Sequence, residues 1–320
     1  MAISAFGDMK PFSKLMFALF VMVASVLVFV VVAMILAIPF FGTENMINSV
    51  SASGSTAESI NFLKYFQVIQ SIGLFVVPPF ILARLYHGNI SEYLQFNRST
   101  RWQTFLLATL ALILAIPLIN FLGAINSQMK FPEALAGIEQ WMRSMEDLAD
   151  AMVEKFMKVE TISGLLFNIF MVAMLPALGE ELMFRGVFQR IFSDWTKNYH
   201  WGIWITAFFF SAIHMQFYGF LPRMALGAMF GYLLVWTGTI WVPILAHFAN
   251  NALGVLEYYL IDKRVISKEI SDWGADSSQL PLVIFSTIIT AFLLFLIYRR
   301  EQAKIKMPVN QLESQASRID

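Results

Sequence analysis

Hydrophobic residues in this chain gather into long, almost unbroken runs separated by short polar segments. A helix needs about 20 consecutive apolar residues to cross the hydrocarbon core of a bilayer. The runs predict eight such helices, at residues 15–41, 62–86, 102–122, 162–180 and a few residues beyond, 202–214, 221–236, 240–259 and 280–298. The expected fold is therefore all-α, a polytopic membrane protein with about eight transmembrane helices and a polar cavity between them.

One sizeable polar segment, residues 127–160, interrupts this pattern. Its apolar side chains recur at steps of three and four residues, as in Ile138, Trp141, Met145, Leu148 and Met152, which predicts an amphipathic helix. Its polar face is acidic, whereas a helix that binds anionic lipid is basic. We expect it to cap the outer face of the helix bundle, and a substrate gate is the alternative.

The runs and the polar segment together predict five regions along the chain. They are an N-terminal three-span region (1–126), an extracytoplasmic amphipathic insertion (127–160), a four-span core (161–260), a loop with the last span (261–300) and a polar cytoplasmic tail (301–320).

Composition supports a membrane protein and narrows its chemistry. Hydrophobic residues make up 58% of the chain and charged residues 14%, against about half and a quarter in soluble domains. Twenty-two basic and twenty-two acidic residues give no net charge, so no strong electrostatic partner is implied and we expect no nucleic acid. Membrane lipid is the partner expected for the apolar spans. Cysteine is absent, which excludes disulfides, a cysteine nucleophile and metal sites with cysteine ligands.

Lysine and arginine in short loops mark the cytoplasmic side of a membrane protein. They lie near both ends of the chain and after the second and fourth spans, while residues 42–61 carry none. This alternation predicts that both termini are cytoplasmic, with Lys263, Arg264 and Lys268 as an exception. We expect a multi-pass protein of a bacterial inner membrane.

Ionisable side chains at membrane depth are costly and usually functional. The fourth span contains Glu180, Glu181 and Arg185. Glu181 and Arg185 are four residues apart on one helix face, in the order that favours an ion pair. Glu180 points about 100° away from Glu181, so we expect it to be free for chemistry.

Two further spans place polar side chains in apolar surroundings. His247 and Asn251 share a helix face, and such a pair of donors can hold a developing oxyanion. His214, at the end of the fifth apolar run, is a candidate base or metal ligand. The sequence lacks the His-Glu-x-x-His, Gly-x-Ser-x-Gly and phosphate-binding-loop motifs of common hydrolases.

The three motifs, in this order on successive spans, resemble the CAAX protease and bacteriocin-processing family. Glu-Glu-x-x-x-Arg starts at Glu180, Phe-x-x-x-His ends at His214, and His-x-x-x-Asn joins His247 to Asn251. The resemblance covers about residues 160–260. It implies an eight-helix intramembrane endopeptidase, of the type II CAAX prenyl endopeptidase kind, with a polar cavity that opens to the cytoplasm.

The resemblance also implies roles for these residues. Glu180 would activate water with help from His214, His247 and Asn251 would hold the oxyanion, and Glu181 with Arg185 would organise the site. We expect no cofactor. The alternative is a zinc ion on Glu180, His214 and His247, since carboxylates and imidazoles suit zinc.

The substrate class stays open at the level of sequence. A membrane-associated peptide of the CAAX or bacteriocin-leader type is expected. A non-catalytic immunity or scaffold protein and a transporter are the competing interpretations, because a transporter also places glutamate and histidine at mid-membrane.

Overall fold

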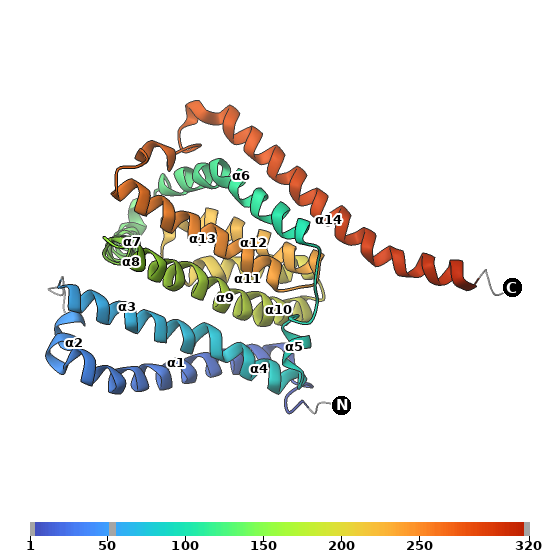
Figure 1. Cartoon of the computed structure of the whole chain (residues 1–320), viewed down its shortest axis with the longest axis horizontal. Helices are drawn as coiled ribbons and strands as arrows, with labels where there is room; N and C mark the ends of the chain where they lie inside the picture. The colour runs from blue at the N-terminus through green and yellow to red at the C-terminus, as the bar shows by residue number, and fades with distance from the viewer. Residues whose placement is uncertain (1–3, 51–55, 317–320) are drawn as a thin grey trace.

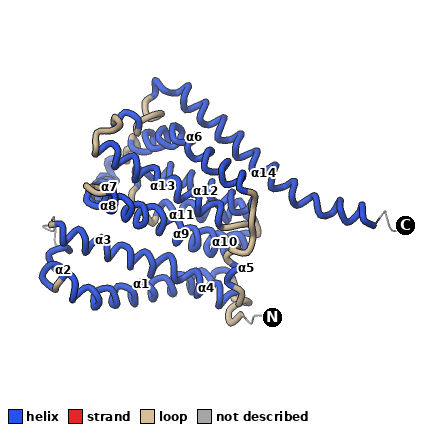
Figure 2. The backbone as a smooth tube through the Cα atoms, in the orientation of Figure 1, coloured by secondary structure: helices blue, strands red, loops and turns tan. Residues whose placement is uncertain are grey.

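The computed structural model describes residues 4–50 and 56–316, and within these ranges every regular element is helical, without a strand (Figures 1 and 2). The all-α class predicted from the apolar runs is therefore confirmed. The α-helices are α1 (Pro11–Phe41), α2 (Thr43–Val50), α3 (Ala57–Ser71), α4 (Val77–His87), α5 (Ile90–Tyr93), α6 (Trp102–Ser127), α7 (Ala136–Met157), α8 (Ile162–Asn168), α9 (Leu175–Glu180), α10 (Gln189–Thr196), α11 (Tyr199–Ala212), α12 (Phe220–Thr237), α13 (Trp241–Asp262) and α14 (Leu280–Ala316).

Over residues 4–50 and 56–316, three π-helical segments, Ile72–Val76, Ile169–Met174 and Glu181–Phe188, join shorter helices into longer rods. The first two come just before Pro78 and Pro176, whose rings cannot donate a backbone hydrogen bond. In the wider π-helical turn, backbone amides donate to carbonyls five residues back, as the amide of Val77 does to the carbonyl of Ile72. Such segments often occur at functional sites.

Within the described residues, six helical rods are long and apolar enough to cross a membrane: Pro11–Phe41, Ala57–His87, Trp102–Ser127, Ile162–Thr196, Phe217–Thr237 and Ser277–Ala303. A multi-pass membrane protein is therefore confirmed, while the count of eight spans stays a prediction. The predicted fifth span is α11, whose 14 residues reach only about 21 Å, short of the roughly 30 Å hydrocarbon core. The predicted seventh span is α13, which is 22 residues long but carries several polar side chains.

The chain runs back and forth between two ends of the bundle (Figure 1). The N-terminus, α5 and the start of α13 lie at one end, where the indole of Trp241 donates to the carbonyl of Phe96. We call this the terminal end, because the chain enters α1 there and the C-terminal end of α14 points in the same direction. At the other end, here the α7 end, lie α2, α7 and residues 263–279, and Lys263 pairs with Glu160.

Two segments are more helical than the sequence pattern indicated. The predicted loop 42–61 contains α2, and the last helix continues through Ala316 into the predicted tail. Residues 51–55 of that loop and 317–320 of that tail lie outside the described residues. The amphipathic helix predicted over 127–160 is present as α7.

Helix α7 is fixed to the bundle at its C-terminal end by one buried polar group. The side-chain amide of Asn168 donates to the carbonyls of Phe156 and Met157, at 2.8 and 3.3 Å. Its oxygen accepts a 2.9 Å hydrogen bond from the ammonium of Lys64, which is itself buried. Helices α3, α7 and α8 are thus joined around Asn168.

The rod that carries the two glutamates packs closely on the N-terminal spans at Gly179. A Cβ atom placed there would lie 2.9 Å from Cβ and 3.2 Å from the carbonyl carbon of Phe75. Real Cβ atoms do not approach so closely, so an added methyl group must push the two rods apart. Only glycine allows this contact next to Glu180.

We therefore expect Gly179→Ala to destabilise the protein by about 1–3 kcal/mol, the usual cost of overpacking. The matched control is Gly254→Ala in α13, where nothing lies within 4 Å of the added Cβ. Because alanine favours a helix over glycine by roughly 0.5–1 kcal/mol, the control should be neutral or stabilising. Equal unfolding temperatures for the two variants in detergent would contradict this packing.

Candidate active site

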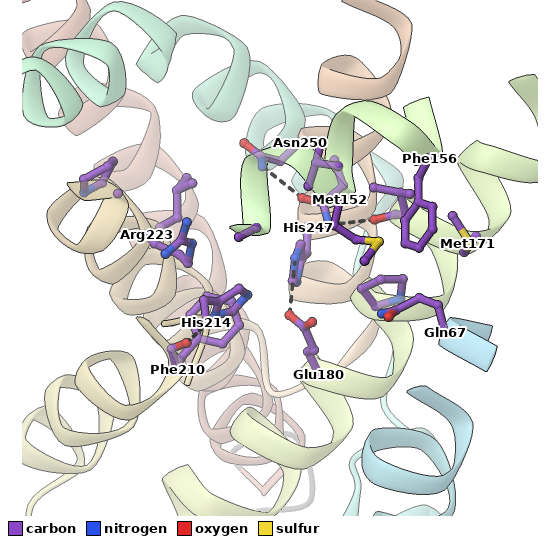
Figure 3. A pocket seen from close by; sticks show the side chains of 18 of the residues that line it. Gln67, Met152, Phe156, Met171, Glu180, Phe210, His214, Arg223, His247 and Asn250 are labelled. Atoms are coloured by element: carbon purple, nitrogen blue, oxygen red, sulfur yellow. Dashed lines mark hydrogen bonds and ion pairs between the residues drawn. The ribbon is translucent and has the colours of Figure 1, made fainter. Parts of the chain in front are cut away.

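A cavity of about 650 Å³ lies inside the bundle, between Glu180 and α7 (Figure 3). Four of the six residues predicted for the site line it: Glu180, His214, His247 and Asn251. They come from the rod of α9, from the end of α11 and from α13. Spans far apart in the sequence therefore place these side chains around one space.

The other two predicted residues, Glu181 and Arg185, lie behind the cavity wall. Their side chains have no exposed surface, and Nη1 of Arg185 is 2.8 Å from Oε1 of Glu181. The second guanidinium nitrogen, Nη2, donates to the carbonyl of Gly227 at 3.0 Å. The guanidinium carbon also lies 4.5 Å from the ring centre of Phe210. Both charges are enclosed by neighbouring side chains, so they can support the site but have no access to substrate.

His247 connects this buried pair to the cavity. Its Nδ1 lies 2.8 Å from Oε1 of Glu181, the same oxygen that accepts from Arg185. Its Nε2 faces Oε2 of Glu180 at 3.9 Å, as Figure 3 shows. The imidazole stacks on the ring of Phe230, with centroids 5.0 Å apart. These contacts fix the ring plane and direct Nε2 toward Glu180.

His214 is fixed in a similar way by the backbone of its own helix. Its Nδ1 lies 2.7 Å from the carbonyl oxygen of Phe210. A carbonyl only accepts, so the hydrogen of a neutral imidazole must be on Nδ1, which leaves a lone pair on Nε2. His247 follows the same rule, because the Glu181 oxygen already accepts from Arg185. Both neutral histidines therefore offer Nε2 as a base.

Asn251 is oriented by two neighbours. Its amide nitrogen donates to the carbonyl of Val172 at 3.3 Å, and its oxygen accepts from the amide of Asn250 at 3.1 Å. The carbonyl of Val172 belongs to a π-helical segment. One amide hydrogen of Asn251 thus remains for the cavity, which both asparagines line.

A smaller cavity of about 210 Å³ adjoins the site on the side of α3 and the π-helical segment Ile72–Val76. Glu180 and His214 line this cavity as well as the large one. Its other walls include Gln67, Gln70 and Phe75. The carboxylate of Glu180 and the imidazole of His214 therefore stand between two spaces.

Sequence reasoning missed three contributors to the cavity. From the sequence, Arg223 was expected to reach water, because it lies near the end of a span. In the structure it lines the cavity. Its guanidinium donates to the backbone carbonyl and to the side-chain oxygen of Gln216. Gln67 comes from the second span, which lies outside the resemblance. Helix α7 supplies Met152 and Phe156, so it forms a wall and not only a cap. Gln67 could have been found from the sequence, because it is a polar residue within the apolar run 62–86.

The alternative zinc site can be tested against this geometry. Glu180, His214 and His247 line one cavity, and both imidazoles present a nitrogen lone pair. Over the described ranges, however, no three histidine, aspartate or glutamate side chains converge closely enough to hold a metal ion. The three residues as placed do not fit a zinc ion, and no step of the mechanism below passes through one.

Comparisons with known proteins agree with this part of the chain. An uncharacterised protein of Bacillus subtilis, YpbD, is 31% identical over 90 residues, which cover 27% of this chain and 43% of that protein. An uncharacterised 24.3 kDa protein of Escherichia coli is 26% identical over 115 residues, or 34% of this chain and 52% of that protein. The chain thus spans about half the length of these curated relatives. No solved structure matches it.

The family comparison covers the same region as the site. Residues 162–253 match the model of type II CAAX prenyl endopeptidase Rce1-like proteins, a family of proteases. This range runs from α8 into α13 and includes all six predicted site residues. Over residues 162–253, the chain is therefore similar to proteins of the Rce1-like family.

Proposed function

We propose that this protein is an intramembrane endopeptidase that hydrolyses a peptide bond of a membrane-associated substrate with water activated by Glu180. The observation that carries the proposal is the position of Glu180 and His214 between two cavities. An endopeptidase must accommodate chain on both sides of the bond that it cleaves. A peptide that extends from the large cavity into the small one would pass beside both side chains.

In the proposed reaction, a water molecule attacks the carbonyl carbon of the scissile bond. Glu180 takes a proton from this water and returns it to the leaving nitrogen, so that the carboxylate is regenerated. His214 assists, because its Nε2 lone pair can accept a hydrogen bond from the same water. The free amide hydrogen of Asn251 stabilises the negative oxygen of the tetrahedral intermediate.

His247 shares this last role when its Nε2, the nitrogen that faces Glu180, carries a hydrogen. Glu181 supports catalysis indirectly, because its Oε1 lies 2.8 Å from Nδ1 of His247 and orients the imidazole ring.

The test is peptide cleavage by the purified protein in proteoliposomes, with and without a chelator. The substrates would be a panel of membrane-associated peptides, one of them prenylated. Cleavage that is indifferent to chelator supports the proposal. Cleavage lost to chelator and restored by zinc would instead make Glu180, His214 and His247 ligands. Binding of a partner protein without cleavage of any peptide would favour the immunity or scaffold interpretation.

Arg223 offers the large cavity a positive charge, and we expect it to bind a carbonyl or carboxylate group of the substrate. A hydrogen bond to a charged group contributes about 1.5–3 kcal/mol, so Arg223→Gln should raise KM roughly 10- to 100-fold with little change in kcat. The matched control is Arg299→Gln on exposed α14 surface, which should leave both constants unchanged. A lower kcat with an unchanged KM would contradict this role for Arg223.

A further inference from the structure

We propose that the cavity of Glu180 opens to the extracytoplasmic face of the membrane, so that the substrate is a peptide segment presented from outside the cell or from the outer leaflet. The substrate statement rests on the proposed function, whereas the direction of the cavity does not. The inference follows from two independent features of the molecule: the end of the bundle at which the cavity lies, and the charge of the two ends.

The cavity extends from the middle of the bundle toward the α7 end. Beyond Glu180 its walls are Met152 and Phe156 of α7, and Gly219 and Pro222 at the start of α12. The turn from α11 into α12 contacts α7 through Gln216 and Tyr218. There the amide of Tyr218 donates to Glu146 of α7.

Toward the terminal end the cavity is closed by a buried layer. Glu181, Arg185, Phe184 and Phe230 are all 2% exposed or less. A separate cavity of about 410 Å³ enters from the terminal end, and it reaches Arg185. It shares no lining residue with the cavity of Glu180. Water that enters the 410 Å³ cavity from the terminal end therefore does not reach Glu180 through that cavity, and the smaller cavity beside Glu180 shares no lining residue with it either.

The two ends of the bundle differ in basic residues. Segments 4–14, 84–101, 190–198 and 299–306, at the terminal end, carry eleven lysines and arginines over 46 residues. Segments 42–50, 56–61, 128–161 and 262–279, at the α7 end, carry seven over 67 residues, together with thirteen acidic residues. Basic residues near span ends are retained in the cytoplasm. The terminal end is thus the cytoplasmic one.

Two expectations from the sequence consequently exclude each other. Cytoplasmic termini and a cavity open to the cytoplasm would require Glu180 to be reached from the terminal end, where the buried layer lies. With the termini inside, the cavity opens outside. A prenylated peptide in the cytoplasmic leaflet could not reach Glu180, whereas a segment in the outer leaflet or outside the cell could.

The absence of cysteine permits a direct test, since every introduced thiol is the only one in the chain. Met152→Cys places it on the α7 wall of the cavity, and Leu226→Cys and Asn250→Cys place it deeper. Ser99→Cys is the control on the terminal end, where the side chain is exposed. Each full-length variant is treated with a membrane-impermeant thiol reagent in right-side-out vesicles, before and after permeabilisation.

We expect Met152→Cys and at least one deep variant to be labelled in sealed vesicles, and Ser99→Cys only after permeabilisation. Labelling of Ser99→Cys but not Met152→Cys in sealed vesicles would overturn the orientation. Deep thiols that react only after permeabilisation, or not at all, would overturn the open cavity. The measurement needs no proteolysis, so a failed cleavage assay and a wrong orientation remain distinguishable.

Discussion

Replacing Glu180 by glutamine is expected to abolish peptide cleavage. Glutamine has nearly the same shape as glutamate but cannot take a proton from water. General-base catalysis contributes about 10²- to 10⁴-fold, and kcat should fall by at least this factor. The carboxylate has no ion pair shorter than the 3.9 Å approach to His247, so its neutral replacement should leave the fold intact.

The measurement compares wild type, Glu180→Gln and Glu92→Gln in the same proteoliposome assay, with unfolding temperatures recorded in detergent. Glu92 is exposed on α5 and lines none of the cavities described above, so it controls for the same chemical change. Cleavage by Glu180→Gln at the wild-type rate would show that another group activates water. A loss of folding in this variant would separate a structural effect from a catalytic one.

Replacing Arg185 by methionine is expected to have the largest effect on stability. The side chain of Glu181 would keep its charge at zero exposed surface, with only the imidazole of His247 as a partner. Breaking a buried ion pair by removing one member costs about 3–5 kcal/mol, because the remaining charge is left uncompensated. The carbonyl of Gly227 would also lose its donor.

The double variant Glu181→Gln with Arg185→Met removes both charges and should recover much of this loss. It should not recover cleavage, because the imidazole of His247 would lose the carboxylate that orients its ring at 2.8 Å. Chemical unfolding of the two single variants and the double variant gives the coupling between the two residues. Additive losses of stability would mean that the ion pair has no energetic role, in spite of its 2.8 Å distance.

The positions of the helices were accessible to sequence analysis because they follow from local composition. Long apolar runs fixed the rods that begin at Pro11, Ala57, Trp102 and Ile162. Hydropathy alone was a weaker guide to which helices span the membrane where packing against other helices shapes a segment. Helix α11 reaches only about 21 Å and its turn into α12 contacts α7, so the fifth span stays a prediction.

In the candidate site, contacts within one helix could be predicted from the sequence, whereas contacts between helices could not. Spacing on one helix predicted that Glu181 and Arg185 would form a pair, because residues four apart share a face whatever surrounds the helix. Spacing could not place His247 on the same oxygen of Glu181, which depends on how α13 packs against α9. It also could not reveal Arg223 or Gln67 as cavity residues, since their neighbours come from other spans.

By itself, the sequence determined that this is an all-helical membrane protein with a few titratable side chains at membrane depth. These properties depend on hydrophobicity and on helical periodicity, which act over neighbouring residues. Only the tertiary structure decided that Glu180 and His214 lie between two cavities, and that a buried layer around Glu181 and Arg185 closes one end. Cavities and their openings are the space left between packed helices, and that space depends on contacts between residues far apart in the chain.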